Sequence, residues 1–201
     1  VKSTYLVEDN IKDDNVLINN YMNRASIFLE DSNPSKSIMK AIDALKEAHE
    51  INPNNINILD IGGYCYLLLV NSEVEEEKRK SFINNAEYCF NKILTIEEER
   101  DLIVYKKTLS NFGFLKLELK DIGKALYYFH EAEKIQDDSV YVNEMIECGK
   151  NFCYWKTSDD DNIQSFETFK DSLKRNSWYK KDKEKLFRFF KLNKEIISKI
   201  N

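Results

Sequence analysis

The sequence predicts an all-α protein, and three observations carry this prediction. The chain has 201 residues but only 5 Gly and 2 Pro, fewer than strand-rich folds or Gly-rich phosphate loops need. Apolar residues recur at spacings of three and four, and no segment shows the alternation of a strand. An eleven-residue pattern that opens with Ala and closes with Ile also occurs three times.

Composition indicates a globular chain, with 42% hydrophobic and 32% charged residues. The net charge of −5 argues against a surface tuned as a whole to nucleic acid. The charge is uneven, since the stretch from Lys174 to Asn201 holds ten Lys/Arg and three Asp/Glu. The longest apolar run, residues 64–70, is far shorter than the roughly 20 residues of a membrane span. We therefore expect no membrane partner.

Cysteine usage and the N-terminus bear on the compartment. The four cysteines are Cys65, Cys89, Cys148 and Cys153. No two of them form a C-x-x-C pair, and three or all of them fall on apolar helical faces. We expect core thiols in a reducing compartment, the cytoplasm. Residues 1–15 lack the apolar core of a secretory signal. Whether a signal segment was removed ahead of Val1 is left open.

The helices are expected in order after a lead-in, residues 1–13, that is extended or frayed. Asp13 or Asp14 can cap the first helix. Pro34 and Pro53 separate the first three helices, because neither fits inside a continuous helix. A fourth helix follows the polar run 71–80, and the acidic run before Ile163 caps the eighth. The expected helices span about 14–30, 38–51, 55–71, 81–95, 100–119, 121–136, 138–155, 163–175 and 180–200.

One pattern recurs in these helices. Its copies are AIDALKEAHEI (41–51), AEYCFNKILTI (86–96), ALYYFHEAEKI (125–135) and, more weakly, SFETFKDSLKR (165–175). Each places a large apolar residue four positions after a small one, and the first positions lie 45, 39 and 40 residues apart. Small residues seven apart on one helical face let a partner helix approach closely. Since one helix pair cannot bury its apolar faces alone, the sequence predicts stacked helical hairpins.

With the helix before it, the best copy resembles the tetratricopeptide repeat. LSNFGFLK and the following copy supply Leu109, Phe112, Gly113, Lys116, Ala125, Phe129 and Ala132, with Asp137 where Pro is usual. Earlier copies supply Ile58, Ile61, Gly62, Cys65, Ala86, Phe90 and Ile93, and Ala41, Leu45, Ala48 and Pro53. The resemblance implies a right-handed superhelix of three to four antiparallel hairpins over residues 14–175. A basic amphipathic capping helix at 176–201 closes it. The spacings exceed the family's 34 residues, which leaves the repeat count open.

Catalytic motifs are absent from the sequence. The two histidines, His49 and His130, lie beside packing positions 81 residues apart, and no nucleophile has a base at motif spacing. The acidic run Asp159–Asp161 is interpreted as a helix-capping loop rather than a cation site. We expect no catalytic residues, no bound metal and no cofactor.

The sequence instead favours a protein- or peptide-binding scaffold or adaptor, with a concave groove lined by the first helix of each hairpin. The expected groove residues are Leu59, Tyr66, Lys107, Ser110, Phe114, Leu117, Tyr141 and Glu144. Whether the groove is open or covered by the C-terminal helix stays undecided. The chain could also be a subunit of a larger complex or a homodimer.

Two alternative functions remain. One is a regulatory protein that senses a peptide and changes shape when it binds. The other is association with nucleic acid through the Lys-rich C-terminal helix, which the acidic whole makes the less favoured partner.

Overall fold

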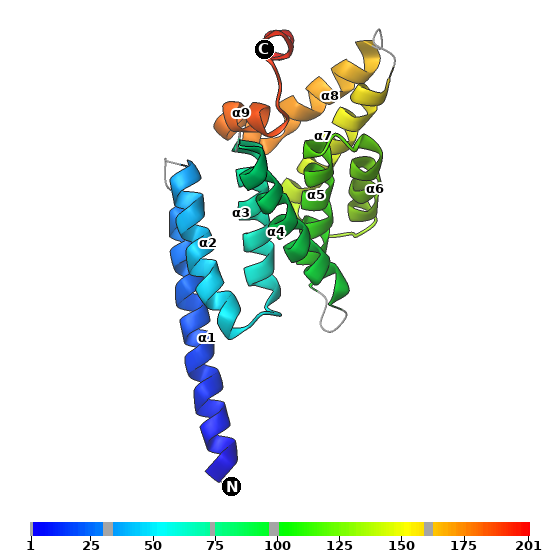
Figure 1. The fold of residues 1–201 in the computed structure, drawn as a ribbon. Helices are drawn as coiled ribbons and strands as arrows, with labels where there is room; N and C mark the ends of the chain where they lie inside the picture. Colours follow the sequence, from blue (N-terminus) through cyan, green and yellow to red (C-terminus); the bar gives the residue numbers. More distant parts are fainter. Residues whose placement is uncertain (1, 30–33, 73–74, 97–100, 159–162) are drawn as a thin grey trace. The chain divides into compact units, whose positions relative to one another are not determined.

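A computed structural model of the chain describes residues 2–29, 34–72, 75–96, 101–158 and 163–201. Over these ranges every regular element is a helix, so the all-α prediction is confirmed (Figure 1). The chain divides into two compact units, Val1–Ile96 (unit 1) and Glu97–Asn201 (unit 2). The sequence predicts no boundary there, although the polar run of residues 97–101 separates two apolar helices.

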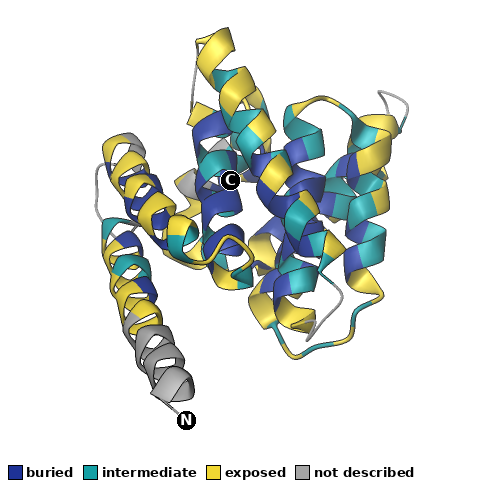
Figure 2. Ribbon diagram, turned by 60° about the horizontal axis from the view of Figure 1, so that its bottom comes forward, coloured by how far each residue is buried: buried dark blue, intermediate teal, exposed yellow. Residues whose placement is uncertain are grey.

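Unit 1 consists of four helices. They are α1 (Lys2–Leu29), α2 (Pro34–Ile51), α3 (Ile56–Ser72) and α4 (Glu76–Thr95). Helix α1 packs along α2 and α3 packs along α4, while α2 also contacts α3. Apolar side chains such as Ile18, Ile42, Leu45 and Leu69 form the core of this unit. Figure 2 shows buried and exposed residues alternating along the helices, as expected for helices that bury one side.

Unit 2 contains six helices within its described residues. They are α5 (Leu102–Glu118), α6 (Ile122–Glu133), α7 (Val140–Thr157), α8 (Ile163–Arg175), α9 (Ser177–Phe189) and α10 (Lys194–Ile200). From α5 to α9 each helix contacts the next, and α5 also contacts α7. Two helices begin at acidic caps: Asp101 accepts hydrogen bonds from the backbone N–H groups of Ile103 and Val104, and Asp121 from that of Lys124.

The repeated small residues are buried as the sequence predicts. Ala41, Ala86 and Ala125 have 0% of their surface exposed, and so do the large residues Phe90 and Phe129. The weak fourth copy follows in part, because Phe169 and Ser172 are buried while Ser165 is half-buried. The pattern therefore marks positions where neighbouring helices come close together.

The rings of Phe90 and Phe129 lie directly over glycines. A Cβ added at Gly63 would lie 2.4 Å from Phe90 Cε1, and one at Gly113 would lie 2.6 Å from Phe129 Cε1. On α7, a Cβ at Gly149 would lie 2.5 Å from the same Phe129 ring, at Cζ. Gly63 is thus the counterpart of Gly113, whereas the sequence comparison aligned Gly62 with it. One residue corresponds to about 100° of rotation around a helix.

The expected extended lead-in, residues 1–13, is wrong, because α1 begins at Lys2. The chain has no Gly and no Pro before Pro34, so nothing in this stretch stops a helix from extending backwards from its apolar part. The first helix is therefore 28 residues long.

The single helix expected over residues 180–200 is also wrong, because two helices, α9 and α10, lie there. Within α9, Asp182 has non-helical angles (φ −156°, ψ 76°). Lys191 then takes a left-handed conformation (φ 49°), and the Leu192 N–H donates to the Phe187 carbonyl at 3.0 Å. This pattern terminates α-helices. Asn193 caps α10 by accepting from the Ile196 N–H at 2.8 Å.

Replacing Gly63 by Ala is expected to lower the free energy of unfolding by about 1–3 kcal/mol, because the methyl group must displace the buried Phe90 ring. Gly62→Ala is the matched control. Its Cβ would meet only Cys89 Sγ, at 3.8 Å, so we expect a gain of up to about 1 kcal/mol from better helix propensity. Urea denaturation followed by circular dichroism measures both. Equal effects of the two substitutions would contradict the assigned contact.

Candidate binding surfaces

The predicted groove residue Phe114 is not open to a ligand. Its side chain is only 4% exposed. The Phe114 ring packs against Phe129 of α6, against Phe189 at the end of α9 and against Phe190 just after it, with ring-centroid distances of 4.9, 4.6 and 5.7 Å. The C-terminal segment of the chain therefore covers this part of the surface.

Two further predicted groove residues contact the same segment. The ring of Tyr141 lies 5.5 Å from that of Trp178. The Glu144 carboxylate accepts hydrogen bonds from the backbone N–H of Ser177 at 2.9 Å and from its hydroxyl at 2.5 Å. Phe114 of α5 and Tyr141 and Glu144 of α7 thus each contact part of residues 177–190. We call the surface formed by these three residues the C-terminal docking surface.

The other predicted groove residues of unit 2 lie on the same helix as Phe114. Ser110 is buried, whereas Lys107 and Leu117 are half-buried. Next to Leu117, the Glu118 carboxylate forms an ion pair with Lys191, which follows α9. The C-terminal segment thus contacts α5 near its end through an aromatic pair and through a charge pair.

A buried asparagine fixes the start of this segment. Asn176 has 0% of its surface exposed and lies between α8 and α9. Its amide Nδ2 lies 3.6 Å from both Met145 Sδ and Cys148 Sγ of α7. Its Oδ1 accepts from the Trp178 N–H at 2.9 Å. One side chain therefore links the C-terminal segment to α7 and starts its first turn.

Unit 1 contains a pocket of about 160 Å³ between α2, α3 and α4. Its apolar lining consists of Ile42, Leu45, Ile58, Leu59, Gly62 and Cys89. Its more polar lining consists of Lys46, His49, Tyr66, Asn85 and Tyr88. We call this cavity the α2–α4 pocket. Leu59 and Tyr66, the two groove residues predicted in unit 1, both line it.

Leu59 and Tyr66 nevertheless lie on another side of their helix than the sequence predicts. They face α2 and α4, which are the second helices of their hairpins, instead of lining a surface made by first helices. The Tyr66 ring lies 6.3 Å from that of Phe82 on α4, and burial raises the pKa of Tyr66 to about 12. The one-residue error at Gly62 explains the difference, because it rotates every assignment on α3 by about 100°.

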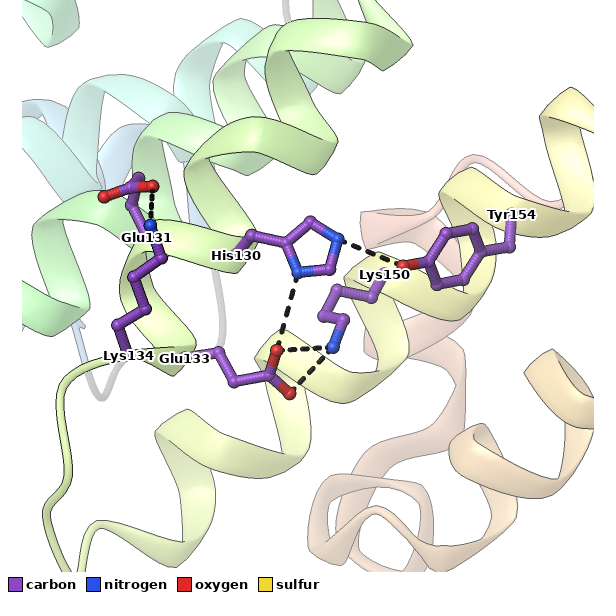
Figure 3. A network of polar contacts seen from close by, with 6 residues as sticks. All are labelled: His130, Glu131, Glu133, Lys134, Lys150 and Tyr154. Atoms are coloured by element: carbon purple, nitrogen blue, oxygen red, sulfur yellow. Dashed lines mark hydrogen bonds and ion pairs between the residues drawn. The ribbon is translucent and has the colours of Figure 1, made fainter.

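The two histidines take part in surface contacts. The His49 ring meets the edge of the Tyr88 ring at 6.2 Å. In unit 2, His130 belongs to a polar network between α6 and α7 (Figure 3). Its Nε2 lies 3.0 Å from the Tyr154 hydroxyl, its Nδ1 lies 3.5 Å from Glu133, and Lys150 donates to Glu133 at 2.6 Å. The Lys150 hydrogen bond is the main cause of a lowered Glu133 pKa.

A buried ion pair that the sequence analysis did not predict joins α5 to the loop before α7. The Lys106 side chain is 2% exposed, and its Nζ lies 3.0 Å from Asp137 Oδ1, whose side chain is 8% exposed. Lys106 also donates to Asn143 Oδ1, and Asp137 Oδ1 accepts from the Ser139 N–H at 3.0 Å. Although burial opposes it, the hydrogen bonds that Asp137 accepts from Lys106 and from the Ser139 N–H hold its pKa below its ordinary 3.8.

All four cysteines are buried thiols without a disulfide, as the sequence predicts. Burial raises the pKa of Cys65, Cys89, Cys148 and Cys153 to about 12. Thiols with such a pKa are poor nucleophiles near neutral pH. Within the described ranges no cluster of His, Cys, Asp and Glu could hold a metal ion. The acidic run Asp159–Asp161 lies outside those ranges.

No described helix combines the length and the apolar content that crossing a membrane requires. Comparison with known protein families, with curated proteins and with solved structures found no match.

Lys106→Met is expected to lower the free energy of unfolding by about 3–5 kcal/mol at pH 7, because it leaves the Asp137 carboxylate buried without its cation. Adding Asp137→Asn should recover part of this loss, and urea denaturation of the single and double variants measures the coupling.

The pH dependence of the free energy of unfolding tests the same ion pair. Because the folded-state pKa of Asp137 is lowered, its stabilising effect is present above pH 3.8 and is lost as the pH falls through the folded-state value. Asp137→Asn should therefore flatten the acid side of the stability profile. Equal stability of native protein and Lys106→Met at pH 7 would contradict the buried pair.

Proposed function

We propose that the chain is a non-enzymatic protein- or peptide-binding module, a scaffold or adaptor built on tetratricopeptide-like hairpins. One observation carries the proposal: three predicted groove residues, Phe114, Tyr141 and Glu144, each contact a segment of the chain's own C-terminal end. The residues that the sequence predicts as a peptide site thus contact an amphipathic helix with aromatic side chains.

The helix packing supports the architectural part of this proposal. Ala86 and Ala125 are followed by Phe90 and Phe129, and both rings lie over a glycine of the preceding helix. Such recurring contacts are what stacked hairpins with similar interfaces require. The four buried thiols support a reducing compartment, for which we propose the cytoplasm.

The two surfaces differ in whether a partner can reach them. The C-terminal docking surface is covered by Trp178, Phe189 and Phe190. The α2–α4 pocket is lined by exposed side chains, among them Tyr88 with 52% of its surface exposed. A partner that binds the chain as it stands would therefore use unit 1.

Photocrosslinking tests this assignment. With p-benzoylphenylalanine in place of Tyr88, we expect the full chain to crosslink a discrete protein in extracts of its own cells. The same amino acid in place of Tyr127, a tyrosine of unit 2 that is 59% exposed, is the matched control. The protein identified by mass spectrometry should bind the native chain after purification, and at least tenfold more weakly after Tyr88→Asp but not after Tyr127→Asp. Equal crosslinking at the two positions would count against the function proposed here.

A second candidate is a peptide-sensing regulator in which a ligand displaces the C-terminal segment. The helical breaks at Asp182 and Lys191 favour it, because a segment already divided into short pieces can leave its surface stepwise. The basic side of this segment gives less support to nucleic-acid binding, since its apolar residues Leu186, Phe187 and Phe190 are buried, as a capping role requires.

Tryptophan fluorescence separates the regulator from a simple adaptor. In a Trp155→Phe background, Trp178 is the one remaining tryptophan of the two in the chain. A regulator should show a red shift of Trp178 emission and a larger radius of gyration by X-ray scattering when its ligand is added. An adaptor that binds unit 1 should leave the emission maximum unchanged.

A further inference from the structure

We infer that the α2–α4 pocket binds one aromatic side chain of a partner polypeptide. This inference rests on the proposed binding function and names the chemistry that unit 1 recognises. It depends on the glycine in the pocket wall, on the size and lining of the cavity, and on a contrast with the corresponding helices of unit 2.

Gly62 opens the pocket at a cost to its own helix. A glycine inside a helix is less favourable than alanine by about 1 kcal/mol. Helix packing accounts for Gly63, whose Cβ would collide with Phe90, but not for Gly62. A Cβ at Gly62 would meet one side-chain atom within 4 Å, Cys89 Sγ at 3.8 Å. The missing side chain at Gly62 therefore serves the cavity, not the contact between helices.

The volume and the lining suit a ring. The pocket has about 160 Å³, and an apolar protein cavity of about 150 Å³ accepts benzene. Its deep wall is apolar, with Leu45, Ile58 and Leu59 all less than 5% exposed. A ring placed there replaces water against these side chains, and this gives a favourable free energy of transfer.

The rim adds aromatic and polar groups. His49 and Tyr88 meet edge to face at 6.2 Å, and both line the pocket. Aromatic rings prefer such edge and offset contacts with one another, so a third ring beside this pair gains more than an aliphatic group of the same size. Asn85 and Lys46 supply hydrogen-bonding groups at the edge. An indole N–H or a neighbouring peptide group could use them.

In unit 2, α6 and α7 correspond to α2 and α3 of unit 1, and polar side chains join α6 to α7. Eight positions after the first Ala of the repeat, unit 1 has His49 and unit 2 has Glu133. In unit 2, Lys150 of α7 reaches across to Glu133, and Tyr154 reaches His130 (Figure 3). Gly63 of α3 and Gly149 of α7 are the glycines of these first helices that face a phenylalanine ring, and counted from them Lys150 corresponds to Tyr64. At the described positions His49 and Tyr64, α2 and α3 thus have no counterpart of the charged pair that bridges α6 and α7.

The open rim favours a polypeptide as the source of the ring. Lys46 and Tyr88 are both exposed, so a small free molecule in the pocket keeps part of its surface in water. A side chain that belongs to a peptide gains further contacts from its neighbours along α2 and α4. We therefore assign the site to a Trp, Phe or Tyr side chain of a bound protein.

Titration of the ¹⁵N-labelled full chain with N-acetyl-tryptophanamide tests the inference, with the amide signals of Gly62 and Gly63 as reporters. We expect a dissociation constant on the order of 1 mM, as for other single-group ligands. Gly62→Leu, which fills the pocket, should weaken binding at least tenfold. Gly123→Leu is the matched control, because Gly123 is an exposed helical glycine of unit 2 whose Cβ would meet only Asp121 Oδ1, at 4.0 Å. The cyclohexylalanine analogue should bind several-fold more weakly.

Several outcomes overturn the inference. They are no shift at Gly62 or Gly63, equal binding by native protein and a folded Gly62→Leu variant, and equal binding of the cyclohexyl analogue. Binding of free indole at least tenfold tighter than that of N-acetyl-tryptophanamide would assign the pocket to a small molecule and overturn the polypeptide.

The proposed function is tested separately by crosslinking at Tyr88. A partner that crosslinks there but binds Gly62→Leu as tightly as the native chain overturns the aromatic site and leaves the function standing. The opposite result is Gly62-dependent binding of N-acetyl-tryptophanamide when no protein crosslinks at Tyr88. It leaves the aromatic pocket standing, overturns the proposed binding function and excludes a polypeptide as the ligand.

Discussion

The close contact between a phenylalanine ring and a glycine backbone sets the geometry of both units. Phe90 lies over Gly63, and Phe129 lies over Gly113 and Gly149. Each ring is fully buried, and each glycine removes the atoms that would hold the facing helix further away. On the same two helices as the rings, the small residues Ala86 and Ala125 are fully buried as well. The surfaces available for binding are those that this packing leaves over.

Much of the fold could be predicted from sequence, because it depends on local patterns. Spacings of three and four define the helices, and the Ala–Phe pattern identified residues that are indeed fully buried. The break at Lys191 could not be predicted, because left-handed backbone usually appears at glycine and here a lysine adopts it. The ion pair of Lys106 was also beyond prediction, since its partners Asp137 and Asn143 lie 31 and 37 residues further along the chain.

The candidate sites show how a small register error propagates. Two adjacent glycines, Gly62 and Gly63, match the repeat pattern equally well in sequence, and only the position of Phe90 distinguishes them. The sequence analysis therefore placed Leu59 and Tyr66 in a groove of first helices, whereas both line the α2–α4 pocket on another side of α3. In unit 2 the predicted groove residues Phe114, Tyr141 and Glu144 each contact the C-terminal segment. The sequence pattern could not predict that the C-terminal segment covers these residues, because contacts between residues far apart in sequence determine this packing.

The position of Phe129 between two glycines has a consequence for how unit 2 can evolve. One ring belongs at once to the contact of α6 with α5 and to that of α6 with α7. If a hairpin were deleted, duplicated or exchanged between α5 and α7, either the Phe129 ring would lose a packing partner or one of the two glycines would face an unfilled space. Insertions and losses of repeats should therefore be tolerated at other junctions, and the block from α5 to α7 should be inherited as a whole.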